Sequence, residues 1–121
     1  MVARYVMAIQ EPSVETSSPA QIARAIVKVN KAPGPTRAGL DVLWKLYYAT
    51  DHTLTRAELE QEFGVLENHF GLFCRRVAGE LGADDPDSLA LVNSSPDEDG
   101  RQVLTLKPSV VAAIRFHAFS K

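Results

Sequence analysis

Apolar residues recur at intervals of three and four along much of this chain, which is the spacing of amphipathic helices. The clearest stripe lies between residues 66 and 81 and consists of Leu66, Phe70, Phe73, Val77 and Leu81. Ahead of it, Thr55 and Glu58 have the spacing of a capping box that starts a helix. Gly64 is suited to the left-handed conformation that ends one. We therefore predict a short helix, a glycine turn and a longer helix from about Leu66 to Leu81.

The stretch from Arg37 to Thr50 is the most apolar of the predicted helices. One stripe contains Leu40, Leu43, Trp44 and Tyr47, and the roughly opposite side carries Val42 and Leu46. A helix that is apolar on two sides is usually buried between other elements. We expect it to pack on the two helices that follow and, on its other side, on the N-terminal strand and helix or on a second subunit. Trp44 and Tyr47 are expected in the core rather than in a ligand platform.

The N-terminal part predicts a strand and a further helix. Val2 to Ile9 is rich in Val, Ile and Tyr, as strands are. Ser18 and Gln21 then form a second capping box, and the helix that follows extends to about Lys31. Its buried stripe is expected to contain Ile22, Ile26 and Val29.

The C-terminal part predicts a hairpin and a last helix. Two strands, Leu89 to Val92 and Arg101 to Leu106, flank a turn-rich loop from Asn93 to Gly100. Pro108 is suited to the first turn of a helix that ends near Phe119. Because this helix is apolar on more than one side, we expect it to form a dimer contact or to cover the hairpin. A further domain following it is the alternative.

These segments, from Pro35 to Leu106, resemble the winged-helix family. The resemblance implies an α+β, mainly α fold: a winged helix-turn-helix with an N-terminal strand-helix extension and a C-terminal helix. The single domain would comprise an extension (1–34), a winged-helix core (35–106) and the last helix (107–121). One residue departs from the family pattern, because Glu60 stands where a small residue usually admits the second helix. We expect a looser or differently angled helix crossing for that reason.

The second helix of this motif supplies the candidate DNA-binding residues. With its apolar stripe buried, the other side is expected to present Asn68, Gly71, Leu72, Arg75 and Arg76, flanked by Glu67 and His69. An asparagine can bond the N6 and N7 edge of adenine, and an arginine can bind guanine or phosphate. Gly71 would allow close approach of the backbone, and Leu72 could touch a methyl group. Arg56 and Arg101 are further candidates.

A purely structural interpretation of the same helix stays open. In it Asn68 caps the helix, Leu72 packs on a partner, and the arginines pair with Glu80 or nearby carboxylates. The DNA-binding interpretation requires that Asn68, Leu72 and Arg75 be open to solvent.

A shorter similarity points in the same direction. The segment NHFGLFCRRVAGELG, residues 68–82, is similar to the winged-helix modules of restriction endonucleases that sense modified bases. That similarity implies a DNA-reading module, sensitive to adenine methylation. A transcriptional regulator fits the same residues at least as well.

Charge separates two hypotheses. The net charge is −2, whereas nucleic-acid-binding domains are usually basic. The basic excess lies in residues 1–50, where Arg24 and Lys28 form either a solvated helix face or a pair of phosphate contacts. The predicted wing tip carries Asp97, Glu98 and Asp99, which phosphates would repel. The first hypothesis is a double-stranded DNA-binding protein that forms a homodimer. The alternative is a protein–protein interaction module that does not bind DNA.

Composition and motifs argue against an enzyme. His52, His69 and His117 are scattered and lack metal-ligand spacing to each other or to Cys74. Cys74 is either a reactive thiolate or, as we expect, a small buried apolar residue. We predict no catalytic residues, metal, cofactor or small-molecule ligand. With no signal peptide and no run of about 20 apolar residues, a cytoplasmic protein without a membrane span is expected.

Overall fold

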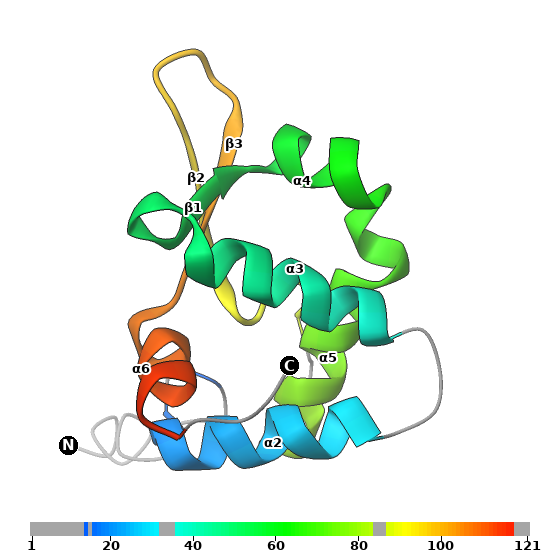
Figure 1. The fold of residues 1–121 in the computed structure, drawn as a ribbon, viewed down its shortest axis with the longest axis vertical. Coiled ribbons are helices and arrows are strands. Elements are labelled where there is room, and N and C mark those ends of the chain that lie inside the picture. The colour runs from blue at the N-terminus through cyan, green and yellow to red at the C-terminus, as the bar shows by residue number, and fades with distance from the viewer. Residues whose placement is uncertain (1–13, 15, 32–35, 84–86, 118–121) are drawn as a thin grey trace, which may run out of the picture.

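The computed structural model describes residues 14, 16–31, 36–83 and 87–117 of the 121-residue chain. In these residues the fold is α+β and mainly helical, with a small three-stranded antiparallel sheet. Its elements are α2 (Pro19–Lys31), α3 (Thr36–Tyr48), β1 (Thr53–Thr55), α4 (Arg56–Phe63), α5 (Phe70–Glu80), β2 (Val92–Pro96), β3 (Gln102–Leu106) and α6 (Pro108–Phe116). Figure 1 shows the β2–β3 hairpin projecting at one end and α2 lying at the other. The strand predicted for Val2 to Ile9 lies outside the described residues.

The N-terminal helix α2 begins at the predicted capping box. The backbone N–H of Gln21 donates to Ser18 Oγ (3.2 Å), and the backbone N–H of Ser18 donates to Gln21 Oε1 (2.8 Å). These two bonds satisfy N–H groups that have no partner within the helix. The predicted stripe of Ile22, Ile26 and Val29 is buried, and α2 packs against α5, α6 and α3.

Helix α3 is buried on both sides, as its sequence predicts. Both Leu43 on one stripe and Val42 on the other are inaccessible to solvent. One side packs on α5, and the other contacts include the sheet strands β1 and β3 as well as α2. At the α5 crossing a Cβ added to Gly39 would lie 2.5 Å from Phe73 Cβ, so the two backbones can approach this closely only because residue 39 is glycine.

The short helix α4 begins and ends where the sequence predicts. Thr55 Oγ1 accepts from the Glu58 backbone N–H (3.0 Å), and Glu58 Oε1 accepts from the Thr55 backbone N–H (2.9 Å). Gly64 ends the helix with a φ of 83°. No local sequence pattern predicts β1, because this three-residue strand depends on pairing with β3, in which Leu54 is opposite Leu104.

The prediction of one continuous helix from Leu66 to Leu81 was wrong. Leu66–Asn68 forms a 3₁₀ turn, and α5 starts only at Phe70. The two are separated by His69, whose backbone (φ −143°, ψ −64°) is not helical. The break is stabilised by hydrogen bonds of the His69 side chain itself. The apolar stripe is nevertheless buried as expected, except for Leu81, which is partly exposed.

Glu60 forms two hydrogen bonds within its own chain. Its Oε2 accepts from the Leu66 backbone N–H (3.2 Å) and from Arg56 Nε (3.4 Å). A carboxylate at this position therefore caps the 3₁₀ turn, and the looser helix crossing expected from Glu60 stays a prediction.

The sheet has the strand order β1–β3–β2. Its last strand matches the prediction to within one residue, but the first hairpin strand was misplaced: it is Val92–Pro96, not Leu89 to Val92. Leu89 and Leu91 belong instead to a turn in which Asp87 Oδ1 accepts from the Leu89 backbone N–H (3.0 Å). Leu91 is buried in this turn, and its carbonyl accepts from the Lys107 backbone N–H (3.1 Å) just beyond the paired strands.

The last helix, α6, covers α2 rather than the hairpin. It buries Val110, Ala113 and Ile114 and ends at Phe116, three residues before the predicted end. Phe116 is 72% exposed. Among the described residues, none of the helices has the length and apolar character that a membrane crossing needs.

Candidate nucleic-acid interface

The outward side of the α5 region is open at the positions that matter most for the DNA-binding hypothesis. Asn68 and Arg75 are exposed, whereas Leu72 and Arg76 are half-buried. Within the described residues, neither the Asn68 carboxamide nor the Arg75 guanidinium has a hydrogen-bond or ion-pair partner. Glu80, an expected partner of the arginines, forms an ion pair with Lys28 instead (3.0 Å). An exposed amide therefore lies on the 3₁₀ turn before α5, and an exposed guanidinium lies on α5 itself.

Gly71 is not on that open side, which corrects the sequence interpretation. It is buried, and a Cβ added there would lie 3.3 Å from Ser88 Cβ and 3.5 Å from the Leu66 carbonyl oxygen. Gly71 therefore allows α5 to pack against its own chain near Ser88. It cannot provide close backbone approach to an external partner.

His69 is likewise buried rather than flanking an exposed surface. It is 8% exposed, Nε2–H donates to the Phe63 carbonyl (2.9 Å), and Nδ1 accepts from the Phe70 backbone N–H (2.8 Å). Because one ring nitrogen must donate and the other accept, these bonds select a single neutral tautomer. His69 thus links the end of α4 to the start of α5 and is a structural residue.

Arg56 is engaged by several neighbours of its own chain. Its guanidinium bonds Glu67 and Glu60, and Nη1 donates to Gln102 Oε1 (3.3 Å). The hydrogen bond with Glu67 is the main cause that raises the pKa of Arg56, and the same bond lowers the pKa of Glu67. Glu67, although exposed, is therefore committed to Arg56.

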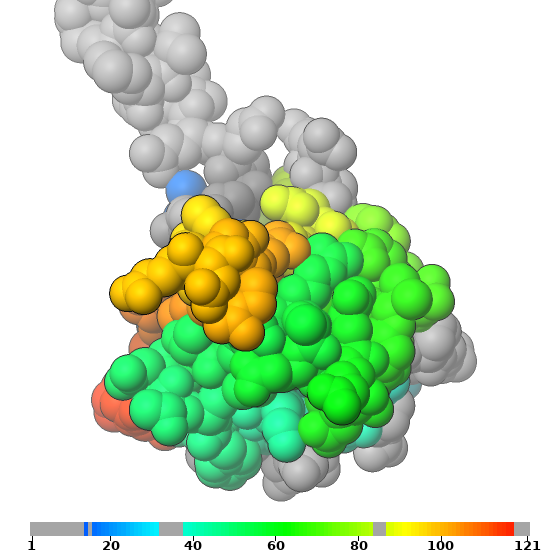
Figure 2. All heavy atoms as spheres, turned by 90° about the horizontal axis from the view of Figure 1, so that it is seen from above, coloured from blue at the N-terminus to red at the C-terminus, as the bar shows by residue number. Residues whose placement is uncertain are grey.

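A polar chain extends this cluster into the hairpin. Gln102 Nε2 donates to Ser94 Oγ (2.6 Å), so Ser94, Gln102, Arg56 and Glu67 connect β2 and β3 to the turn before α5. In Figure 2 the hairpin, yellow to orange, lies directly beside the green surface of α4 and the residues after it. The hairpin and the turn before α5 therefore form one continuous polar surface.

The basic residue of the hairpin tip, Arg101, is bound by carboxylates of the same tip. Arg101 Nε donates to Asp97 Oδ2 (3.0 Å), and Nη2 donates to Asp99 Oδ2 (3.1 Å). Asp97 Oδ1 also accepts from the backbone N–H groups of Asp99 (2.9 Å) and Arg101 (2.8 Å), which lowers the pKa of Asp97, the Arg101 bond most. Arg101 is exposed, but Asp97 and Asp99 neutralise its charge at the place where a phosphate would have to bind.

The only cysteine is not part of any exposed site. Cys74 lies on the buried side of α5 and is fully buried, and burial raises the pKa of its thiol to about 12. This confirms the interpretation of Cys74 as a small buried apolar residue. No group of three or more potential metal-ligating side chains occurs among the residues that the structure describes.

Comparison of the chain with models of protein families, with curated proteins and with solved structures found no match. The exposed side chains must therefore indicate the function by their own chemistry. Asn68 can both donate and accept hydrogen bonds, Leu72 adds an apolar contact, and Arg75 offers a planar set of donors to an anion.

Sequence reasoning missed the cluster around Arg56. The spacing of Arg56 and Glu60, four residues apart on α4, was a usable signal of an ion pair. The bonds from Arg56 to Glu67 and Gln102 join segments 11 and 46 residues apart, and no local pattern encodes them. Their effect is to remove Arg56 and Glu67 from the set of uncommitted charges.

Proposed function

We propose that this chain is a winged-helix protein that binds double-stranded DNA through α5. The order helix, short strand, helix, helix and hairpin over α3 to β3 supports the proposal, as does the central place of β3 in the sheet. In this proposal α4 and α5 are the helix-turn-helix and β2–β3 is the wing. A cytoplasmic transcriptional regulator or DNA-reading module is the corresponding cellular role.

The observation that carries this proposal is the exposed polar chemistry on α5 and on the 3₁₀ turn that precedes it. Asn68 would read an adenine edge, Leu72 would contact a thymine methyl group, and Arg75 would bind guanine or phosphate. With 11 residues, α5 is about 16 Å long, and a helix fits the width of a major groove.

The wing contributes little phosphate binding in this proposal. Asp97 and Asp99 already neutralise Arg101, and Glu98 adds a further exposed negative charge. DNA would therefore approach α5 with the wing tip turned away from the phosphates. We also propose a homodimer, in which Phe116 is the exposed apolar side chain that a second copy would cover.

The direct experiment is fluorescence anisotropy of a labelled random-sequence duplex titrated with the protein at several salt concentrations. The binding constant should fall as salt rises, because phosphate contacts release counterions. Arg75→Ala should weaken binding by roughly 1 kcal/mol or more, about fivefold at least. Arg115→Ala, which removes an exposed arginine on α6, is the matched control and should leave binding unchanged. Absence of duplex binding at low salt would rule the proposal out.

Base reading is tested separately by selecting binding sites from random duplexes, with and without N6-methylated adenine. Asn68→Ala should remove discrimination between selected and random sites while leaving general affinity nearly unchanged. A methyl group on N6 should weaken binding of the unmodified protein if Asn68 bonds that edge. Equal affinity of Asn68→Ala and the unmodified protein for selected sites would refute base reading.

A protein-interaction module is the second candidate, and two observations favour it. The wing tip is acidic, and Val65, beside the 3₁₀ turn, is 54% exposed. If the duplex titration shows no binding, this candidate predicts a protein partner that contacts Val65 and Leu72. Val65→Ser would then weaken that complex, whereas it should not affect duplex binding.

A further inference from the structure

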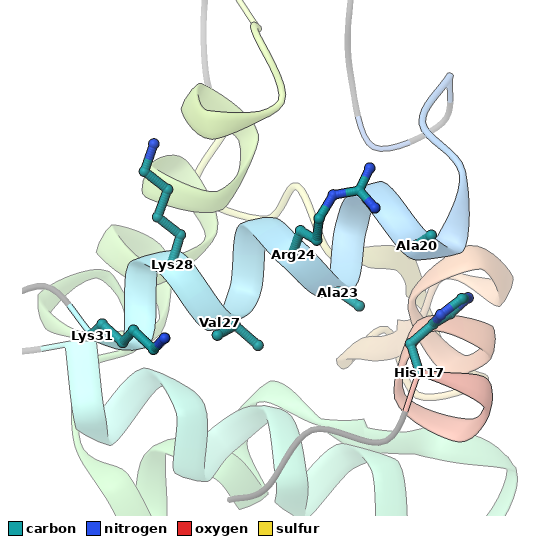
Figure 3. A pocket seen from close by; sticks show the side chains of 7 residues that line it. All are labelled: Ala20, Ala23, Arg24, Val27, Lys28, Lys31 and His117. Atoms are coloured by element: carbon teal, nitrogen blue, oxygen red, sulfur yellow. The ribbon is translucent and has the colours of Figure 1, made fainter.

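A second surface, on the far side of α2, has a different chemistry. A groove of about 600 Å³ lies between α2 and the end of α6. It is lined by Ala20, Ala23, Arg24, Val27, Lys28, Lys31 and His117. Figure 3 shows Ala23 and Val27 between Lys31 at one end and His117 at the other, with Arg24 and Lys28 on the adjoining side of α2.

The floor of this groove is apolar because of helical spacing. Ala20, Ala23 and Val27 are three and four residues apart, so they share one side of α2. Two of them are alanines, which leave the space that larger side chains would fill. Ala23 is only 5% exposed and belongs to the same buried core as Ile22, Ile26 and Val29, which fixes α2 in place beneath the groove. Ala20 and Val27, which are half-buried, form the more accessible part of the floor.

The polar lining of the groove is entirely basic among the described residues. Arg24, Lys28 and Lys31 carry positive charge, and His117 adds a titratable ring. Lys28 forms an ion pair with Glu80 of α5 (3.0 Å). Arg24 and Lys31 are therefore the cations of the groove whose charge is least neutralised. Two other hollows contain carboxylates: Glu80 lines one, together with Arg24 and Lys28, and Asp41 and Glu62 line the other. The described lining of this groove contains no carboxylate, and its charge favours an anion.

We propose that the groove binds a small organic anion with an apolar body, of the class of medium-chain carboxylates. Its volume lies in the range of roughly 300–1,000 Å³ that is typical of small-ligand sites, and an apolar lining with a few directed polar groups is their usual composition. The hydrocarbon part would lie on Ala20 and Val27, and the carboxylate would bond Arg24 or Lys31. This site differs from the sequence-based expectation of no small-molecule ligand and does not depend on DNA binding.

The shape of the groove argues against a nucleic acid as its occupant. An apolar floor cannot form hydrogen bonds or ion pairs with a phosphate backbone. A hydrocarbon chain that binds there leaves water, which is favourable by about 25 cal/mol per Å² of apolar surface buried. The residues of α2 that line the groove extend from Ala20 to Lys31, which is about 16 Å at a rise of 1.5 Å per residue. That length suits a short chain-like molecule.

The test is binding of decanoate to the full chain at neutral pH and below the concentration at which decanoate forms micelles. Titration calorimetry measures affinity directly, and displacement of anilinonaphthalene sulfonate fluorescence gives a second readout. Val27→Asp, which places a carboxylate on the groove floor, should weaken decanoate binding about tenfold or more. The double variant Arg24→Gln, Lys31→Gln should weaken decanoate while leaving the uncharged decanol unchanged. Circular dichroism verifies that each variant is folded.

Two control variants separate this site from general apolar binding. Lys45→Gln removes an exposed cation on α3, and Val65→Ser removes an exposed apolar side chain; neither should change decanoate affinity. Equal binding of decanol and decanoate by the unmodified protein, or loss of binding in Val65→Ser, would overturn the proposal. So would unaltered decanoate binding in both groove variants. If Arg24→Gln, Lys31→Gln weakens duplex binding and decanoate does not bind, the cations serve DNA and the proposal is wrong.

Discussion

Helix α5 and the β2–β3 hairpin are both exposed on one side, but different forces hold them in place. Behind α5, Phe70 and Phe73 are completely buried, and Gly39 of α3 lets the two helices approach closely. The hairpin tip is held instead by exposed ion pairs and turn hydrogen bonds around Asp97. The position of α5 is therefore set by packing, and the shape of the tip is set by ionisation.

This difference indicates how each region should respond to its surroundings. Buried apolar contacts are insensitive to salt and to moderate changes in pH, whereas exposed ion pairs are weak and are screened by salt. A recognition surface on α5 would keep its geometry under conditions that alter the tip. Four experiments test this difference between α5 and the hairpin.

The largest change in stability is expected when a side chain on the buried side of α5 is truncated. Phe73→Ala should lower the free energy of unfolding by about 3–5 kcal/mol, because it leaves a cavity at a fully buried site. Urea denaturation followed by circular dichroism measures the change. Tyr48→Ala, at a side chain that is 74% exposed, is the control and should cost much less. Comparable losses in the two variants would show that packing does not dominate.

Two glycine-to-alanine substitutions, with smaller and opposite effects on stability, test the close approach of α3 and α5. Gly39→Ala should destabilise the fold by about 1–3 kcal/mol, because its Cβ would meet Phe73 Cβ at 2.5 Å. Gly79→Ala on α5 has nothing within 4 Å of the added Cβ and should stabilise by about 0.5–1 kcal/mol, since alanine favours helix. Thermal unfolding of both variants gives the comparison. Stabilisation by Gly39→Ala would mean that the helices are farther apart than described.

Acidification should loosen the hairpin tip while α5 stays in place. The pKa of Asp97 is lowered in the folded chain, so its stabilising contribution is present above the ordinary aspartate pKa and is lost as pH falls through the lowered value. NMR amide shifts of Asp99 and Arg101 should therefore change together at low pH, below about 4. In Asp97→Asn the transition should disappear. Retention of both shifts in unmodified protein at pH 2 would contradict this assignment.

The smallest expected effect is the absence of a reaction. Cys74 has a pKa of about 12 and no exposed surface, so a disulfide reagent at pH 8 should not modify it while the chain is folded. Complete modification should occur in urea. Rapid modification of the native protein would show that α5 opens locally. In that case α5 would not be held more firmly than the hairpin tip.

The sequence predicts helices well where a local signal marks their ends. The Ser18 and Thr55 capping boxes placed the starts of α2 and α4, and Gly64 placed the end of α4. Strand β2 was misplaced because Asn93 to Ser95 lacks apolar alternation, and its register is set by pairing with β3. The break at His69 was missed because a carbonyl six residues away stabilises it.

The candidate interface was predictable only in part for similar reasons. Helical periodicity placed Arg75 on the exposed side of α5. Asn68 is also exposed, but it lies on a 3₁₀ turn outside that helix. It could not show that Ser88 lies against Gly71, since that contact comes from a later turn in the chain. Nor could it show that Arg56 is occupied by Glu67 and Gln102. Charges that a sequence presents as available can therefore be neutralised by distant segments.

The position of Arg56 also limits how this protein can vary. One guanidinium serves acceptors on α4, on the 3₁₀ turn and on β3 at the same time. A lysine would keep the charge but lacks the planar geometry that reaches three directions. Replacement of the hairpin by an unrelated one would thus be transmitted to the start of α5 unless the acceptor at position 102 were retained.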